Sequence, residues 1–265
     1  MGAVNTNHEN ILSVACIGFG EAAGAFVSGW NGTVPARFKA FDIKTDAGGA
    51  AGAQKLRDYA AAQIKGCGTP HEAVAGADAV FSLVTADQAL DAACSVAGGL
   101  DAQAFYFDCN SCAPATKREA AQVIGAAGGR YVDVAVMAPV HPSLHRVPLL
   151  VSGDDATAAL ETLAALDMRA SEVSGGVGAA SAIKLVRSIM MKGLEALMAE
   201  CVLAGRALGV EGVVLDTLEK TYPGFGWPDR ATYMLERATV HGERRAVEMR
   251  EAAAMVGGLG LPSRM

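Results

Sequence analysis

The sequence has few charged residues and few aromatic ones, and its acidic residues outnumber its basic ones. Of 265 residues, 19% are charged and 6% are aromatic, and the formal net charge is -6 at pH 7. This balance argues against a nucleic-acid partner, because neutralising phosphates requires a basic face. Hydrophobic residues make up 51% of the chain, which predicts a globular protein of one large domain or two smaller ones.

Long uninterrupted apolar runs are also lacking. None reaches the ~20 residues that a membrane-spanning helix needs. The longest candidate, residues 179–204, is interrupted by Lys184, Arg187, Lys192, Glu195 and Glu200. The first residues lack the basic start and apolar core of a signal peptide, and residues 1–6 match a myristoylation pattern that is short enough to occur by chance. We therefore expect a cytoplasmic protein without a membrane partner.

Metal-binding and redox patterns are sparse. Cys109 and Cys112 form a single C-x-x-C, and no second pair accompanies it. His141 and His145 are four residues apart, but Pro142 disfavours a helix between them and no third ligand is evident. We expect thiols packed as small hydrophobic side chains in a reducing compartment, and no metal site.

Short apolar runs alternate with amphipathic segments over the first two-thirds of the chain. The runs that we expect to form strands are 11–17, 37–42, 78–84, 103–108, 130–136 and 147–152. The segments that we expect to form helices lie near 21–30, 50–64, 86–97, 113–127 and 154–165. This alternation predicts an α/β fold, in which a Rossmann-type doubly wound parallel sheet is built from β-α-β units.

The pattern changes after about residue 172, and no later strand is expected. A glycine-rich turn at 174–178 precedes a helical stretch rich in Ala, Leu and Met, and a Pro/Gly/aromatic loop at 222–228 precedes a second long helix at 229–256. We expect a Rossmann domain at 1–173 and a smaller all-helical domain at 174–265. The long apolar faces of so few helices need a cover, so we expect a homodimer that buries the helix at 179–208.

The first expected strand runs directly into a G-x-G-x-x-A turn at residues 18–23. Gly18 permits a tight turn, and Gly20 lets the backbone approach a pyrophosphate at the N-terminus of the following helix. The small Ala23 lets that helix pack on the strand. With a strand before it and a helix after it, this turn predicts a dinucleotide-binding site.

An acidic residue, Asp42, ends the second expected strand. There a carboxylate can accept hydrogen bonds from the ribose hydroxyls and repel a 2′-phosphate. This favours NAD as the cofactor. Because Lys44 and Thr45 follow closely, NADP remains open.

The segment from Asp108 to Pro114, with the glycine turn, resembles the β-hydroxyacid dehydrogenase superfamily, which includes 6-phosphogluconate and 3-hydroxyisobutyrate dehydrogenases. The chain looks closest to the branch with a C-terminal domain of unknown function. The segment stands in place of the family's D-x-S-T-x-x-P, which flanks the nicotinamide and contacts substrate, with Asn110 for the usual serine and Ser111 for threonine. Capping the helix that begins near Pro114 is the alternative role.

A second segment departs from the family. After residues 133–136 the family usually has Ser-Gly-Gly, whose backbone amides bind a substrate carboxylate, whereas this chain has Met137, Ala138 and Pro139. Proline has no N–H to donate, and methionine and alanine add bulk. Recognition of the substrate must therefore differ here from that of an ordinary β-hydroxy acid dehydrogenase.

A third segment, Gly176-Val177-Gly178 followed by Lys184, resembles the family's glycine turn and the helix that bears its catalytic lysine. In the family this lysine takes the hydroxyl proton as hydride leaves for the nicotinamide. Independently of the resemblance, Lys184 lies among apolar residues, and desolvation of an ammonium lowers its pKa toward neutrality. The alternative is a lysine that reaches the surface and pairs with a carboxylate.

Further polar residues follow on the expected helices. Ser188 is one turn beyond Lys184, where the family usually has an asparagine that orients the substrate hydroxyl. Lys192, and His241 with its neighbouring arginines 244 and 245, are candidate anion contacts. A surface lysine and solvated ion pairs are the alternatives.

Together these residues predict hydride transfer between NAD, or NADP, and a secondary alcohol or ketone such as a β-hydroxy acid or sugar acid. The alternatives are an imine reductase, whose relatives usually lack the catalytic lysine, and a dinucleotide-binding sensor without turnover. The candidate catalytic residues are Lys184, Ser188 and Asn110. The candidate cofactor contacts are Gly18, Phe19, Gly20, Glu21, Ala22, Asp42, Val84, Thr85 and Asn110. The candidate substrate contacts are Ser111, Met137, Lys192 and His241.

Overall fold

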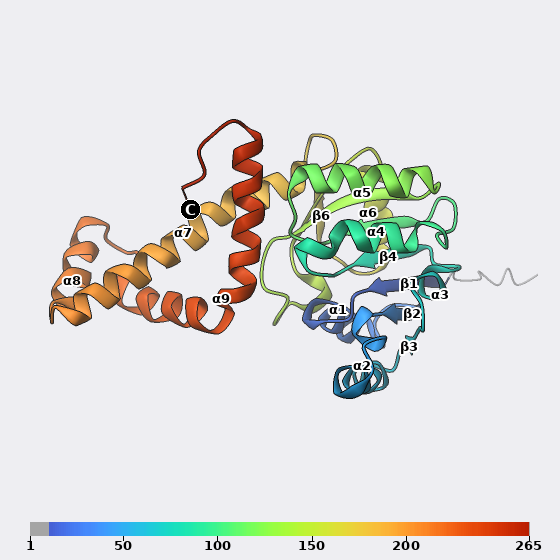
Figure 1. Ribbon diagram of the computed structural model, residues 1–265, viewed down its shortest axis with the longest axis horizontal. Helices are drawn as coiled ribbons and strands as arrows, with labels where there is room; N and C mark the ends of the chain where they lie inside the picture. The colour runs from blue at the N-terminus through green and yellow to red at the C-terminus, as the bar shows by residue number, and fades with distance from the viewer. Residues whose placement is uncertain (1–10, 265) are drawn as a thin grey trace, which may run out of the picture. The chain divides into compact units, whose positions relative to one another are not determined.

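A computed structural model describes residues 11–264, so the myristoylation pattern at 1–6 lies outside the described residues. The chain forms two compact units that divide within one helix, between Lys184 and Leu185. The first unit is a Rossmann-type α/β fold and the second is helical (Figure 1). Among the described residues, every helix is too short or too polar to span a bilayer.

The first unit contains an eight-stranded sheet in the order β3-β2-β1-β4-β5-β6-β7-β8. Neighbouring strands are parallel except for β6 and β7, which are antiparallel. The chain runs outward from β1 to β3 and then crosses to β4 on the other side of β1. The strands are β1 (Leu12–Ile17), β2 (Ala36–Phe41), β3 (Lys65–Gly66), β4 (Ala79–Ser82), β5 (Phe105–Asp108), β6 (Arg130–Val136), β7 (Leu149–Ser152) and β8 (Ala170–Glu172).

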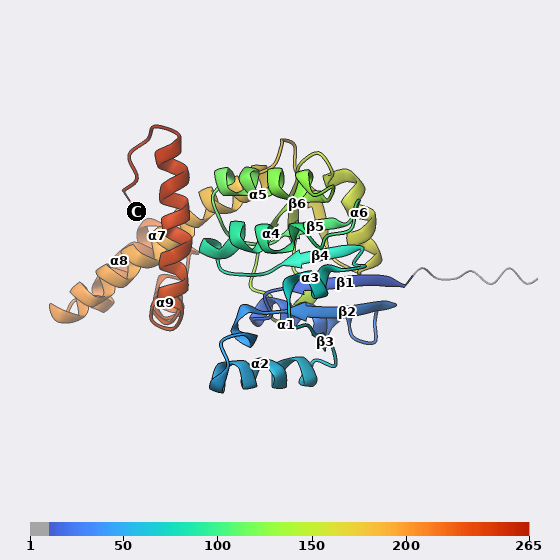
Figure 2. The same cartoon turned by 45° about the vertical axis from the view of Figure 1, so that its right-hand side comes forward.

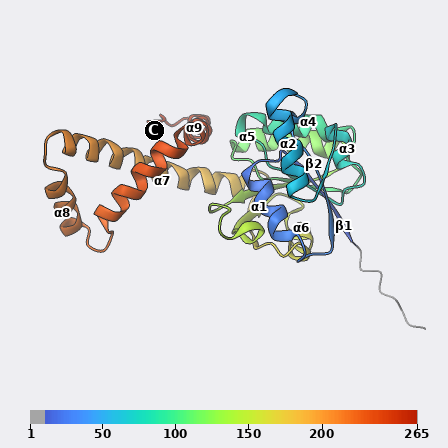
Figure 3. The ribbon, with the colours of Figure 1, turned by 90° about the horizontal axis from the view of Figure 1, so that it is seen from below.

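Helices cover both faces of this sheet, as the turned views show (Figure 2, Figure 3). Alternate side chains of β1 enter two separate apolar clusters, Val14 and Cys16 with α1 and α6, and Ala15 and Ile17 with α3, α4 and α5. The α-helices of this unit are α1 (Glu21–Trp30), α2 (Gly49–Ala61), α3 (Pro70–Val74), α4 (Ala89–Ala97), α5 (Pro114–Ala126), α6 (Ala156–Ala165) and the first turns of α7 (Ala179–Ala207). The 3-10 turns are η1 (Ile43–Thr45), η2 (Ala86–Gln88) and η3 (Leu144–Arg146).

The sequence correctly predicted a Rossmann-type sheet and its longer strands and helices. It missed the short elements β3, α3 and β8, which carry too few residues for a periodic pattern. The parallel sheet predicted from the sequence is confirmed except at β7. The chain returns from β6 to β7 through a loop and η3, without a crossover helix, so β7 pairs antiparallel to β6.

The second unit consists of the rest of α7, α8 (Glu211–Thr221) and α9 (Trp227–Gly258). The sequence predicted α7 and α9 but did not separate α8 from its neighbours. Glu219 holds the loop between α8 and α9, because its carboxylate accepts hydrogen bonds from the backbone N–H groups of Gly224, Gly226 and Trp227. The core of this unit is a small cluster comprising Met198, Val202, Leu215, Ala231 and Met234.

Candidate functional site

The glycine turn lies at the point where the strand order reverses. It follows β1, which lies between β2 and β4 in the sheet. The chain adds β2 and β3 on one side of β1 and then adds β4 on the other side. At such a point the connections after neighbouring parallel strands diverge and leave a crevice at the carboxyl ends. Residues that follow β1, β4 and β5 therefore meet at the place where α/β proteins bind dinucleotides.

Gly18 makes this turn in a way that only glycine tolerates. Its φ is +84°, and an added Cβ would lie 2.6 Å from the Leu83 carbonyl oxygen and 2.8 Å from the Val84 Cγ1. Its N–H donates to the Phe41 carbonyl at 2.8 Å. Gly18 thus brings the end of β1 into contact with the turn after β4, as the sequence predicted for a tight turn.

Asp42 is anchored beside the same turn. One carboxylate oxygen accepts the Phe19 N–H at 2.8 Å, and the other accepts the Lys44 N–H at 2.9 Å. The side chain is only 8% exposed. These two bonds fix the carboxylate at the end of β2, next to the glycine turn, where the sequence placed a ribose acceptor.

Gly20 differs from Gly18 because its surroundings are open. No atom lies within 4 Å of an added Cβ, and Gly20 precedes α1 without providing a side-chain cap for the first helical amides. At the start of this helix Glu21 is exposed and Ala22 is half-buried. An anionic group can approach these N–H groups closely, because Gly20 has no side chain and the helix dipole is favourable there. The residues present therefore fit a bound pyrophosphate.

Residues of helix α2 contact Phe19 of the glycine turn. The Lys55 ammonium donates to the Phe19 carbonyl at 2.6 Å and pairs with Asp58 at 2.9 Å. The ring of Tyr59 packs on that of Phe19 with centroids 5.1 Å apart. Lys55 was not among the predicted site residues, since nothing in the sequence of α2 connects it to the turn.

Asn110 joins the turn after β5 to the turn after β4. Its side-chain oxygen accepts the Val84 N–H at 2.7 Å, and its amide nitrogen donates to the Ser82 hydroxyl and to Asp108. It is 3% exposed. The amide is thus engaged by neighbouring residues, and Asn110 holds the walls of the candidate site together.

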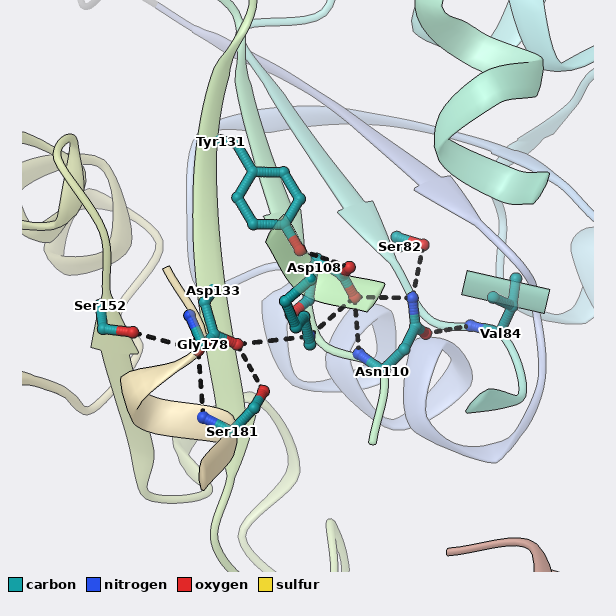
Figure 4. A network of polar contacts seen from close by, with 10 residues as sticks. Ser82, Val84, Asp108, Asn110, Tyr131, Asp133, Ser152, Gly178 and Ser181 are labelled. Atoms are coloured by element: carbon teal, nitrogen blue, oxygen red, sulfur yellow. Dashed lines mark hydrogen bonds and ion pairs between the residues drawn. The ribbon is translucent and has the colours of Figure 1, made fainter. Parts of the chain in front are cut away.

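Beneath these turns lies a buried ion cluster that the sequence analysis missed (Figure 4). Lys117, Asp108 and Asp133 are each 0% exposed. The Lys117 ammonium lies 2.9 Å from Asp108 and 3.4 Å from Asp133, and it donates to the Asp108 carbonyl at 2.6 Å. Burial acts to lower the pKa of Lys117, but the two carboxylates outweigh it and raise that pKa above its ordinary value.

The spacing of Lys117 on its helix is compatible with burial, but the sequence alone does not specify it. Lys117, Ala120 and Ile124 are the buried residues of α5, at the spacing of one helical face. Similarly, Asp133 interrupts the apolar strand β6. A charged residue on an apolar face needs a buried partner of opposite charge, and these residues supply it for one another.

Asp133 also caps the first turn of α7. Its carboxylate accepts the N–H groups of Gly178 at 3.1 Å and Ser181 at 3.0 Å, and the hydroxyl of Ser181 at 2.5 Å. Ser152 donates to the same carboxylate and accepts the N–H of Ala180. The start of α7 is thereby fastened to β6 and β7.

Lys184 lies in the second turn of α7 and is half-buried. Burial raises the pKa of the Cys109 thiol, and the charges of Lys117 and Lys184 oppose that rise. The Lys184 ammonium is therefore close enough to act electrostatically on the end of β5. The raised pKa of Cys109 disfavours its thiolate and hence redox chemistry at this C-x-x-C.

Several other predicted residues border the same edge of the sheet. Thr85 is exposed after β4, and Ser111 is half-buried after β5. Met137 is half-buried after β6, and its N–H donates to the Pro148 carbonyl at 2.9 Å. That amide is thus committed to the protein, in accord with the expectation that carboxylate recognition differs here.

The remaining predicted residues lie in the helical unit. Lys192 pairs with Glu248 at 2.5 Å and donates to the Ser188 hydroxyl at 3.3 Å. Arg245 pairs with Glu195, and His241 is half-buried on α9. The positive charge of Lys192 is therefore already matched by a carboxylate.

The two histidines considered as metal ligands lie in different surroundings. His145 is buried against Gly29 of α1, whereas His141 is exposed. No group of three or more potential metal ligands occurs within residues 11–264.

Two family models match this chain. The NAD binding domain of 6-phosphogluconate dehydrogenase matches residues 50–170, and a domain of unknown function, DUF1932, matches residues 206–265. The first match begins after the glycine turn. The turn and Asp42 are therefore evidence for a dinucleotide site that is independent of that match.

Solved structures resemble the chain over nearly its whole length. A conserved hypothetical protein from Sinorhizobium meliloti is 38% identical with a TM-score of 0.77, covering 96% of this chain and 85% of its own. MTH1747, a conserved protein of unknown function described as similar to 3-hydroxyacid dehydrogenases, is 27% identical with a TM-score of 0.73, covering 94% and 90%. The 3-hydroxyisobutyrate dehydrogenase of Mycobacterium tuberculosis is 17% identical with a TM-score of 0.74, covering 96% and 89%, and shares the fold.

The fold is also that of an imine reductase from Myxococcus stipitatus, solved with NADP+ and, as a variant, with NAD+. The former is 20% identical with a TM-score of 0.63, covering 94% of this chain and 88% of its own. Together with the glycine turn and the matched dinucleotide domain, these findings place the chain among the β-hydroxyacid dehydrogenase-like proteins that carry a C-terminal DUF1932 domain.

Proposed function

We propose that the protein is an oxidoreductase that uses NAD, or less readily NADP, to interconvert a secondary alcohol and its ketone. The substrate class is a β-hydroxy acid or a sugar acid. The observation that carries the proposal is the glycine turn, in which Gly18 is confined by the β4 turn while Gly20 leaves the start of α1 open. That arrangement suits a pyrophosphate on helical amides.

The cofactor contacts that we propose are the ones predicted from the sequence, except Asn110, whose side-chain amide is bound to Val84, Ser82 and Asp108. Gly18 to Ala22 would hold the pyrophosphate, and Asp42 would accept a ribose hydroxyl. Val84 and Thr85, after β4, would border the nicotinamide. When bound, nicotinamide supplies or accepts the hydride, which is the hard part of the chemistry.

The protein itself has to remove or supply one proton at the substrate oxygen. We assign this to Lys184, which would take the hydroxyl proton during oxidation and return it during reduction. Its half-buried position and its place three residues after Ser181, whose N–H is bound by Asp133, support the role. Ser188, one helical turn further along, would orient the hydroxyl, and Ser111 and Met137 would contact the rest of the substrate.

A substrate panel tests this proposal. Turnover is followed by NADH and NADPH absorbance with hydroxy acids, sugar acids and cyclic imines. Lys184→Met should lower kcat by at least about 100-fold, the lower range for loss of a general acid or base, and leave NADH binding intact. Arg187→Met is the matched control, because it removes an exposed charge from the same helix. Equal activity in both variants would remove Lys184 from the mechanism.

Other results of the panel lead to other functions. Turnover of cyclic imines alone would identify an imine reductase. NADH binding without turnover on any substrate would identify a sensor. An Asp42→Asn variant that gains relative efficiency with NADPH supports the assigned role of Asp42, since it removes the charge that repels a 2′-phosphate.

We further propose a homodimer formed through the helical unit. Val186, Met190 and Leu197 recur on one face of α7 and are 57%, 71% and 61% exposed. A contiguous apolar face of this kind favours burial against another protein surface. Sedimentation at micromolar concentration should give a dimer, and Met190→Glu with Leu197→Glu should give a monomer. A monomeric parent protein would contradict the proposal.

A further inference from the structure

The buried ion cluster contains one ammonium and two carboxylates, whereas a simple ion pair has one of each. Its two carboxylates accept hydrogen bonds from separate parts of the chain, and Lys117 lies between them. The cluster thus connects segments that are far apart in sequence. The inference drawn from it rests on the proposed function.

The Asp108 carboxylate serves the turn after β5. One oxygen accepts the Asn110 N–H at 3.0 Å, the Asn110 side-chain amide at 2.8 Å and the Lys117 ammonium at 2.9 Å. The other accepts the Tyr131 hydroxyl at 2.6 Å. Because Asn110 in turn holds the Val84 N–H, the Asp108 carboxylate determines where the β5 turn lies against the β4 turn.

The Asp133 carboxylate serves the first turn of α7. It accepts the N–H groups of Gly178 and Ser181 and the Ser181 hydroxyl. Gly178 has a φ of +100°, and an added Cβ would lie 2.8 Å from the Pro114 Cβ, at the start of the helix that carries Lys117. The first turn of α7 is thus fixed by hydrogen bonds to the Asp133 carboxylate and by close packing of Gly178 on Pro114.

The cluster has more negative than positive charge, and its position offsets part of the difference. Lys117 supplies one positive charge for two carboxylates, and the N-terminus of α7 contributes a partial positive charge at Asp133. All three side chains are fully buried and fully hydrogen-bonded, so the arrangement is rigid. Removing Lys117 leaves two buried carboxylates facing each other without a cation.

We propose that Lys117 is a positioning residue for the reaction: through Asp108 and Asp133 it fixes the Asn110 turn and the start of α7, and so sets where Lys184 stands. Lys184 follows Ser181 by less than one helical turn, so a shift of the capped turn moves its ammonium. Lys117 does not touch the substrate in this assignment. Its effect on the reaction passes through these two segments.

The test compares Lys117→Met with Ile124→Ala in the full chain. Ile124 is fully buried on the same helix, so its truncation destabilises the core without altering charge. Hydrogen exchange is measured for segments 108–114 and 178–184, together with the Kd for NADH and the separate kcat and KM values. Each exchange rate is compared at equal global stability.

Lys117→Met should speed exchange in both segments more than Ile124→Ala does. It should lower kcat by about 100-fold, the loss expected for a displacement of about 1 Å of a reacting group, with little change in KM or in NADH binding. Equal exchange rates and equal kcat in the two variants would mean that Lys117 only stabilises the core, and this would overturn the proposal.

A second variant keeps the test decisive if Lys117→Met does not fold. Asp133→Asn retains an acceptor oxygen for the α7 amides but removes the charge that faces Lys117. It should speed exchange at 178–184 and lower kcat, whereas wild-type values for both would overturn the proposal. If the parent protein turns over no substrate, the proposed function fails, and exchange in the two segments alone decides whether Lys117 positions them.

Discussion

The two units of the molecule bury charge and apolar surface to different extents. In the α/β unit, large aromatic side chains fill the core, and an ion cluster of Asp108, Lys117 and Asp133 is wholly buried. In the helical unit, the core is the small cluster around Met198. The pair of Lys192 with Glu248 is partly exposed, at 12% and 24%, and Arg245 pairs with the buried Glu195.

The two units also differ in how much of their apolar surface is covered by their own helices. The sheet of the first unit is enclosed by helices on both faces, so apolar side chains on each strand find a cover within the same unit. In the second unit, Leu203, Val213 and Tyr233 are more than half exposed. This difference is the reason for assigning the proposed dimer contact to the helical unit.

The largest expected effect concerns the buried cluster. Lys117→Met should lower the free energy of unfolding by about 3–5 kcal/mol, because it strands two buried carboxylates. Chemical denaturation measures this change. A loss of less than about 1 kcal/mol, the range of exposed pairs, would mean that water or protonation relieves the carboxylates and that the contrast between the units is smaller than inferred.

The two glycines of the turn should separate stability from binding. Gly18→Ala imposes a positive φ on alanine, a cost of about 1–3 kcal/mol, and adds a clash with the Leu83 carbonyl. It should lower both the Tm and NADH affinity. Gly20→Ala meets no protein atom and should leave the Tm unchanged while it weakens NADH binding. Normal NADH affinity in Gly20→Ala would place the dinucleotide elsewhere.

The matched lysine in the helical unit should matter less to stability. Lys192→Met removes a partly exposed pair with Glu248 and should cost about 1 kcal/mol or less. The same denaturation experiment measures it. A loss as large as that of Lys117→Met would show that charge in the helical unit is as deeply buried in solution as charge beneath the sheet.

The smallest expected effect is a pH dependence of the loop between α8 and α9. Backbone N–H groups of Trp227 and Gly224 lower the pKa of Glu219. A carboxylate with a lowered folded pKa contributes stability above its ordinary pKa of about 4.3, and this is lost as pH falls through the lower, folded value. Trp227 fluorescence in a Trp30→Phe background should report that acid transition, and Glu219→Gln should abolish it. An unchanged transition in Glu219→Gln would assign it to another group.

Much of the geometry of the candidate site could be predicted because its residues act through the local backbone. The G-x-G-x-x-A turn and Asp42 each follow a strand whose apolar pattern is clear, so the fold brings them to one edge. Asn110 was predicted as a contact for ligands, and its side-chain hydrogen bonds to Val84, Ser82 and Asp108 are visible only in three dimensions. The partners of a buried amide depend on three separate segments, which no local pattern specifies.

The sequence by itself determined the Rossmann-type order of strands and helices, the glycine turn and the all-helical end of the chain. These depend on hydrophobic periodicity and on backbone preferences, which are local properties. Only the tertiary structure decided that β7 runs antiparallel, that Lys117 is wholly buried, and that Asp133 caps α7 across 45 residues of sequence. Burial and ion pairing depend on which segments meet, and that is fixed when the sheet and its covering helices pack together.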